Sequence, residues 1–143
     1  MLSAVDYIHS KRIIHGDIKP ANFVFVRNNL KLIDFGISKV FDDDSEHIVR
    51  ESQIGTINYM APETIVITAE MRAILIGKPS DVWSLGCILY QMLYFHTPFG
   101  KMKTAEKLLA IPDPSIRIDY PSHHDMDATD TVKSCLIKDP TKR

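Results

Sequence analysis

Three side chains suited to metal-assisted phosphate chemistry lie near the start of the chain. In HGDIKPAN (15–22), Asp17 stands five positions before Asn22, and Asp34 closes the next apolar run. Phosphoryl transfer needs metal ions held against the phosphates and a group that orients and deprotonates the attacking hydroxyl. One carboxylate can act as that base, while an amide oxygen and a second carboxylate are hard ligands for Mg²⁺. The spacing therefore indicates a phosphotransfer site.

Two short β-rich runs must position these side chains. NFVFV (22–26) and LKLID (30–34) are separated by RNN, which is typical of a hairpin turn. Because Asn22 enters the first strand and Asp34 leaves the second, a hairpin brings them together. Taken singly, Asp17 is equally a loop carboxylate capping a turn, and DFG (34–36) is equally a strand-end turn. In this order across one hairpin, they favour a phosphotransfer site.

The rest of the chain reads as mainly helical. In MLSAVDYIHS (1–10), Leu2, Val5 and Ile8 share one helical face with Ala4 and His9. Further helices are predicted from APET (61–64), from the apolar run 82–95 opened by KPSD (78–81), and over 104–111 and 127–137. Ser80 or Asp81 is suited to cap the apolar helix, which is expected to be buried on all sides. Residues 64–78 are read as an ordered insertion, a small extra helix or an interaction surface.

Composition is that of an ordinary globular domain. The 143 residues carry a formal charge of −1, with 45% hydrophobic and 24% charged residues. We therefore expect no nucleic-acid partner, and the run 82–95 is too short to span a membrane. Residues 9–31 are locally basic, which fits a zone facing phosphate or simply a solvated face. Cys87 and Cys135 lie in apolar runs and are expected to be reduced core residues of an intracellular protein.

Throughout its length the chain resembles the C-terminal lobe of a eukaryotic-type protein kinase. The resemblance rests on HGDIKPAN, on DFG, and on three later segments in the family's order: GTINYMAPE (55–63), DVWSLGCILY (81–90) and DPTKR (139–143). Aminoglycoside and choline kinases share the His-Gly-Asp and the Asn, but lack the GTINYMAPE segment. The resemblance implies an α+β kinase fold, of which this chain is the mainly helical lobe with a short β-hairpin bearing the catalytic loop and metal site.

The resemblance also implies roles around the nucleotide, with ATP and Mg²⁺ as cofactors. Asp17 would be the catalytic base, and Lys19 would neutralise the γ-phosphate during transfer, as in serine/threonine kinases. Asn22 and Asp34 would hold Mg²⁺. The apolar floor under the adenine would be formed by Val24 and Ile33.

Further roles concern the peptide and the frame of the site. Residues 34–63 would be the activation segment, in which Thr56 belongs to the substrate platform. Glu63 would pair with Arg143, and Asp81 would hold the backbone of the catalytic loop from the central helix. His15 is expected to pack rather than to act in the chemistry.

Several segments are most similar to the monopolar spindle kinases, dual-specificity checkpoint kinases of the kinetochore. They include SQIGTINYMAPE (52–63), TPF (97–99) and LLAIPDPSIRIDYP (108–121), and a small residue such as Gly16 between His and Asp fits that family. This implies transfer of phosphate to Ser or Thr, and also to Tyr, of protein substrates in the nucleus, at the kinetochore or in the cytoplasm. Kinetochore or checkpoint proteins would then be partners.

The sequence contains no glycine-rich loop, no strand Lys of the VAIK type and no partner Glu. Those parts cover the nucleotide in protein kinases. We therefore expect the chain to be an incomplete piece of a kinase, without the nucleotide lobe and the final helix, and inactive in isolation. The alternative is a kinase-derived scaffold or binding module without catalysis. The intact Asp17, Lys19, Asn22 and Asp34 favour the enzyme, since a scaffold need not keep a metal site.

Overall fold

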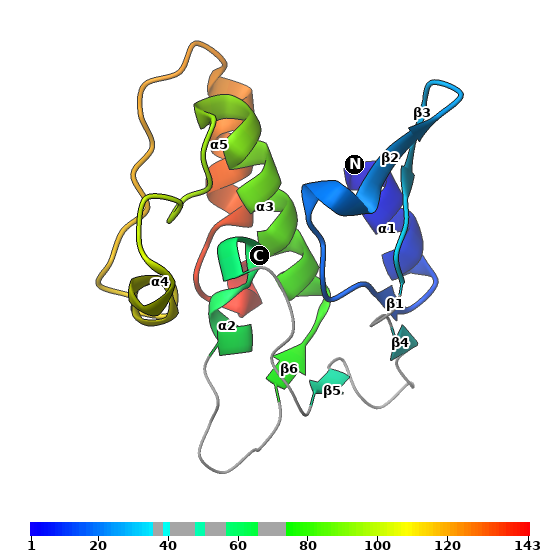
Figure 1. Ribbon diagram of the computed structural model, residues 1–143, viewed down its shortest axis with the longest axis horizontal. Coiled ribbons are helices and arrows are strands. Elements are labelled where there is room, and N and C mark those ends of the chain that lie inside the picture. The colour runs from blue at the N-terminus through cyan, green and yellow to red at the C-terminus, as the bar shows by residue number, and fades with distance from the viewer. Residues whose placement is uncertain (36–38, 41–47, 51–56, 66–73) are drawn as a thin grey trace.

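The computed structural model describes residues 1–35, 39–40, 48–50, 57–65 and 74–143. Within these ranges the helices are α1 (Leu2–Ser10), α2 (Pro62–Ile65), α3 (Lys78–Tyr94), α4 (Thr104–Ala110) and α5 (Met126–Cys135). Three 3-10 turns are η1 (Pro20–Asn22), η2 (Ile57–Tyr59) and η3 (Pro140–Lys142). In Figure 1, α3 stands at the centre, with α1 on one side and α4 on the other. The predicted mixture of helices and a short hairpin is confirmed.

The described strands form three small antiparallel pairs. They are β1 (Ile13–Ile14) with β4 (Lys39–Val40), β2 (Phe23–Val26) with β3 (Asn29–Leu32), and β5 (Ile48–Arg50) with β6 (Ile74–Ile76). The sequence predicts the second pair but neither of the others. The end of the 64–78 stretch thus forms a strand rather than an extra helix, while residues 66–73 lie outside the described ranges.

The β2–β3 hairpin closes through two residues with left-handed backbone. Arg27 and Asn28 have φ of 47° and 62°, and Val26 pairs with Asn29 across the turn. Positive φ at both central positions is the mark of a type I′ turn, whose twist matches that of the two strands. The turn is therefore one residue shorter than the RNN predicted. This register also sets Phe23 opposite Leu32, which brings the two strand ends of the candidate site together.

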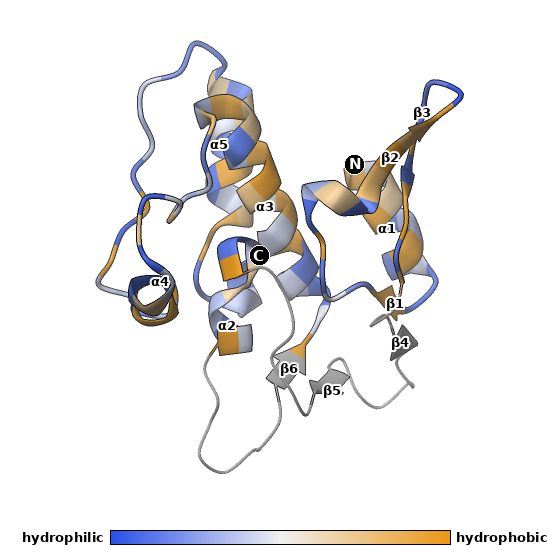
Figure 2. Cartoon of the chain, viewed as in Figure 1, coloured by the Kyte–Doolittle hydropathy of each residue, from blue (hydrophilic) through white to orange (hydrophobic). Residues whose placement is uncertain are grey.

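Helix α3 is the central element, as its apolar sequence predicts. Trp83, Leu85 and Ile88 are buried with most of their neighbours in the helix, and Figure 2 shows apolar colouring along much of its length. The predicted cap is wrong: Gly77 is the N-cap residue. Ser80 Oγ instead accepts a hydrogen bond from the Gly77 backbone at 3.3 Å. Asp81 turns its carboxylate away from the helix end, toward the loop that follows β1.

Helix α5 crosses α3 at a glycine. A Cβ added to Gly86 would lie 2.7 Å from Cβ of Cys135 and 2.9 Å from Cδ2 of Leu136. Such distances are shorter than real side-chain contacts, so Gly86 is what allows α5 to approach α3 this closely. Leu136, Val132 and Cys87 belong to the main core cluster at this crossing.

The Gly86→Ala variant is expected to be destabilised despite the better helix propensity of alanine. The new methyl group must push α5 away, and overpacking of this kind costs about 1–3 kcal/mol. Chemical denaturation should show the lower free energy of unfolding. Met92→Ala on the exposed side of α3 is the matched control, with a change of about 0.5 kcal/mol or less. A Gly86→Ala protein as stable as the wild type would contradict this account of the crossing.

Helix α1 packs through a narrower face than the sequence predicts. Val5 and Ile8 are buried, whereas Leu2 is 51% exposed. Val5 joins Ile18, Phe23 and two side chains of α3 in a second core cluster. This cluster fixes the loop and the hairpin of the candidate site against α3. The prediction for Leu2 is wrong because Met1, rather than Leu2, packs against this cluster beside Val5.

Both cysteines are free and buried, as predicted. Burial raises the pKa of the Cys87 thiol and of the Cys135 thiol, so neither is a thiolate near neutral pH. Among the described residues no helix combines the length and the apolar character needed to cross a membrane.

Candidate active site

The loop that leaves β1 carries the first candidate residues. Gly16 has φ of +76°, a left-handed conformation that favours glycine, and a Cβ there would lie 3.3 Å from Cγ2 of Ile76. Directly after it, Lys19 Nζ donates to Asp17 Oδ2 at 2.6 Å. The two side chains are 27% and 20% exposed, so the ion pair is accessible from outside. A carboxylate and an ammonium thus stand together on a loop with a fixed backbone.

Asp81 holds that loop from the first turn of α3. Its side chain is 1% exposed. Oδ2 accepts from the His15 backbone N–H at 2.9 Å, and Oδ1 accepts from the Gly16 N–H at 2.8 Å. His9 of α1 donates from Nε2 to Oδ2 at 2.8 Å. One buried carboxylate therefore connects α1, the loop and α3.

His15 connects the loop to the hairpin. It is fully buried, and its ring lies 5.3 Å from the ring of Phe35. Nδ1 accepts from the Asp17 backbone N–H at 3.3 Å, and Nε2 donates to the Ile33 carbonyl at 3.2 Å. The tautomer with hydrogen on Nε2 is assigned from these partners. His15 thus fixes the position of the backbone at Ile33, directly before Asp34, relative to the backbone at Asp17.

The hairpin brings Asn22 next to the residue before Asp34. The Ile33 N–H donates to the Asn22 carbonyl at 2.8 Å. Asp34 itself is exposed and has φ of 64°, a left-handed conformation that aspartate, like asparagine, adopts more often than most residues other than glycine. Asn22 is 2% exposed, and its Oδ1 has no hydrogen-bond partner within the described structure.

A buried amide oxygen without a partner is costly unless a ligand satisfies it. Oxygen atoms from an amide and a carboxylate are the donors that Mg²⁺ prefers, so Asn22 and Asp34 fit this ion. No group of three or more His, Cys, Asp or Glu side chains suited to a metal occurs in the described parts of the chain. Any further ligands of a bound Mg²⁺ would come from water and phosphate, as is usual for this ion.

The remaining residues predicted for the nucleotide and the peptide lie in different settings. Val24 is half-buried on β2, and Ile33 is 40% exposed after β3. Val26, on the same face of β2 as Val24, is 48% exposed, whereas Phe25, which is 78% exposed, points to the opposite face. The face of the hairpin that carries Val24 and Val26 is therefore partly open. Thr56 lies outside the described residues.

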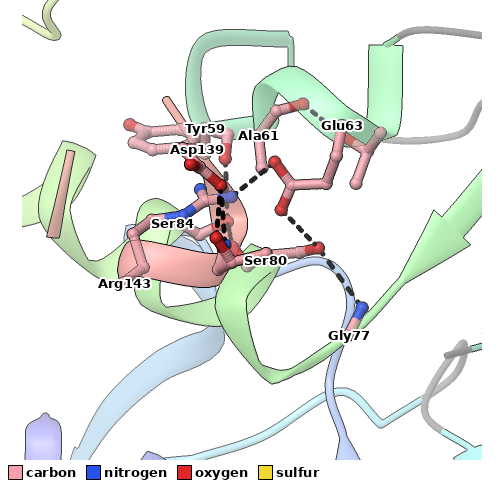
Figure 3. Close-up of polar contacts among 10 residues, drawn as sticks. Tyr59, Ala61, Glu63, Gly77, Ser80, Ser84, Asp139 and Arg143 are labelled. Carbon is pink, nitrogen blue, oxygen red and sulfur yellow. Dashed lines mark hydrogen bonds and ion pairs between the residues drawn. The ribbon is translucent and has the colours of Figure 1, made fainter. Parts of the chain in front are cut away.

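Glu63 and Arg143 form an ion pair at 2.5 Å, although 80 residues separate them. Figure 3 shows this pair beside the start of α3, where Ser80 Oγ donates to the other Glu63 oxygen at 3.0 Å. The Arg143 side chain is 0% exposed, and its guanidinium lies 5.3 Å from the centre of the Trp83 ring. The segment that ends in α2 is therefore tied to both α3 and the end of η3.

Sequence reasoning misses three polar residues that hold this frame. The sequence predicts His9 on the apolar face of α1, but its ring donates to Asp81. Gln91 accepts from the Tyr59 hydroxyl at 2.9 Å. Lys107 donates to Asn58 Oδ1 at 2.7 Å. Their only sequence signal is a polar residue within an otherwise apolar helical stripe, and that signal does not name a partner.

Comparisons with known proteins agree with this architecture. Residues 1–143 match the model of the protein kinase domain. The probable serine/threonine-protein kinase mps1 of Dictyostelium discoideum is 48% identical over 148 residues, and the match covers 100% of this chain and 15% of that protein. Serine/threonine-protein kinase mph1 of Schizosaccharomyces pombe is 42% identical over 166 residues, and the match covers 100% of this chain and 24% of that protein. Dual specificity protein kinase TTK of Mus musculus is 46% identical over 149 residues, and the match covers 100% of this chain and 17% of that protein.

The chain thus spans between 15% and 24% of the length of these relatives. Their names include that of the monopolar spindle kinases, so the resemblance found in the sequence is confirmed. The match to the domain model extends over every residue. The chain therefore belongs to the protein kinase family.

Proposed function

We propose that residues 1–143 are the C-terminal lobe of a protein kinase and that residues 34–63 are its activation segment. The helical body around α3 and the β2–β3 hairpin bearing the candidate site support this assignment. The partly open face of the hairpin that carries Val24, together with Ile33, is suited to form the floor under an adenine ring. A nucleotide-binding lobe would then cover that side in the working kinase.

The proposed reaction is transfer of the γ-phosphate of ATP to a Ser or Thr hydroxyl, and also to Tyr, of protein substrates. The observation that carries it is the Asp17–Lys19 pair on the loop that ends at Asn22, whose buried Oδ1 lacks a partner. Asp17 would orient the acceptor hydroxyl and take its proton at a carboxylate oxygen. Lys19 would balance negative charge on the phosphate during transfer.

Asn22 and Asp34 would hold Mg²⁺, which when bound neutralises charge on the phosphate oxygens. Thr56 would contribute to the platform that receives the peptide. Asp81, His15 and the Glu63–Arg143 pair would keep these parts in place through the contacts described above. From the resemblance to the monopolar spindle kinases we further propose a role in spindle-checkpoint signalling inside the cell, with kinetochore or checkpoint proteins as partners.

The test is transfer of labelled γ-phosphate from Mg-ATP to casein and to myelin basic protein by the purified full-length protein. Phosphoserine and phosphothreonine in the product are the expected result, and phosphotyrosine would show dual specificity. A wild-type protein that binds partners but transfers no phosphate to any protein would favour the scaffold instead.

The metal assignment predicts the behaviour of an Asn22→Ala variant. Loss of the amide oxygen should raise the Mg²⁺ concentration needed for half-maximal activity by about tenfold, because the ion loses one of few protein ligands. Magnesium titration at fixed ATP measures this. Asn29→Ala, an exposed hairpin residue, is the control and should titrate like the wild type. Equal Mg²⁺ requirements in Asn22→Ala and wild type would remove Asn22 from the metal site.

A further inference from the structure

The η2 turn is held by two different helices. From α3, Ser84 Oγ donates to the Tyr59 carbonyl at 2.8 Å, and Gln91 accepts from the Tyr59 hydroxyl at 2.9 Å. From α4, Lys107 Nζ donates to Asn58 Oδ1 at 2.7 Å. The Asn58 side chain thus depends on α4, while Tyr59 depends on α3.

A lysine is unusual at a buried position such as that of Lys107. It is 8% exposed on the inner face of α4, where Ala110 and Ile111 join the main core, while Leu109 on the outer face is 76% exposed. Among the described residues, no carboxylate lies within ion-pair distance of its ammonium group. A buried charge without a counter-charge costs stability, and an apolar side chain of similar shape would cost less.

A gain in folding stability therefore does not explain why a lysine stands at position 107. Its hydrogen bond to Asn58 does explain it. Its ammonium donates to Asn58, the second residue after Thr56, so it fixes the turn directly beyond the proposed peptide platform. A charged donor makes a stronger hydrogen bond than a neutral one. The contact is thus suited to hold one orientation of the turn.

We propose that Lys107 is a positioning residue for the protein substrate, acting through Asn58 on the platform of the acceptor segment. The inference rests on the proposed kinase function and deepens it. It makes α4 a determinant of how the acceptor peptide is held, and assigns it no part in binding ATP.

The test is Lys107→Met in the full-length protein, which removes the ammonium group but keeps the length of the side chain. We expect the KM for a peptide substrate to rise about tenfold, since a hydrogen bond from a charged group is lost. The KM for ATP should be unchanged, and Tm should not fall, because the buried charge is gone. Lys101→Met, at an exposed position before α4, is the control and should leave both KM values unchanged.

A double-mutant cycle with Asn58→Leu identifies the partner. If Lys107 acts through Asn58, the Lys107→Met/Asn58→Leu variant should show a peptide KM no higher than the worse single variant. Independent, multiplicative effects would overturn the proposed route. An unchanged peptide KM in Lys107→Met, or a fall in Tm together with a rise in both KM values, would overturn the positioning role itself.

Amide hydrogen exchange separates this inference from the proposed function. Exchange over residues 57–60 should be faster in Lys107→Met than in wild type and Lys101→Met, whether or not phosphate is transferred. If the wild-type protein is inactive, the kinase proposal fails, while the exchange result still decides whether Lys107 orders the turn. Unchanged exchange over this segment would overturn the inference even in an active kinase.

Discussion

The Asp17→Asn variant is expected to lose phosphate transfer by about 10³- to 10⁴-fold, the upper part of the range for a general base. Asparagine keeps the shape of the side chain but cannot take the proton of the acceptor hydroxyl. It also removes the negative partner that lies 2.6 Å from Lys19 Nζ. Because the Asp17–Lys19 pair is partly exposed and asparagine keeps the shape of the side chain, we expect Tm to change little.

Single-turnover assays with saturating ATP measure the chemical step of this variant directly. ATP affinity should stay near that of the wild type, since Asp17 is not proposed to hold the nucleotide. Asp6→Asn, an exposed carboxylate on α1, is the matched control and should retain full activity. An Asp17→Asn protein with a tenth or more of wild-type activity would exclude Asp17 as the base.

The Asp81→Ala variant is expected to lose both stability and activity. Removal of the carboxylate leaves the N–H groups of His15 and Gly16, and His9 Nε2, without their acceptor. Loss of one partner from a buried charged network costs about 3–5 kcal/mol. The loop that carries Asp17 is then no longer held against α3, so phosphate transfer should fall by about a hundredfold even where the protein remains folded.

Denaturant unfolding and kinetic assays at low temperature separate these two effects. Asp130→Ala is the control, because Asp130 is 68% exposed and pairs with Lys133 on the surface of α5. It should cost less than about 1 kcal/mol and leave the rate unchanged. If Asp81→Ala were as stable and active as Asp130→Ala, the network around Asp81 would have no role in the site.

The elements predicted correctly are those with local signals. The apolar run of α3 and the turn residues of the β2–β3 hairpin each indicate their structure without reference to distant residues. The pairs β1–β4 and β5–β6 carry no such signal, since strands of two or three residues show no periodicity. Their partners are also set by the fold as a whole.

In the candidate site, too, the residues with a local sequence signal could be predicted, whereas the long-range contacts could not. The positions of Asp17, Asn22 and Asp34 around one hairpin follow from spacing, and resemblance supplies their roles. The supporting contacts do not follow from spacing, because His9 and Asp81 are 72 residues apart and Lys107 and Asn58 are 49 apart. The cap predicted at Ser80 or Asp81 is wrong because α3 begins at Lys78, so both residues lie inside the first turn of the helix.

The first turn of α3 has a consequence for synthesis on the ribosome. The loop around His15 is translated 66 residues before its anchor Asp81, and Glu63 is translated 80 residues before Arg143. Closing such long loops has to wait for the later partner, which slows folding. The loop around His15 is therefore without its anchor until α3 emerges from the ribosome, and Glu63 is without its partner until Arg143 emerges. Incompletely folded chains of this kind are prone to aggregate, so we expect the nascent chain to bind chaperones during that interval.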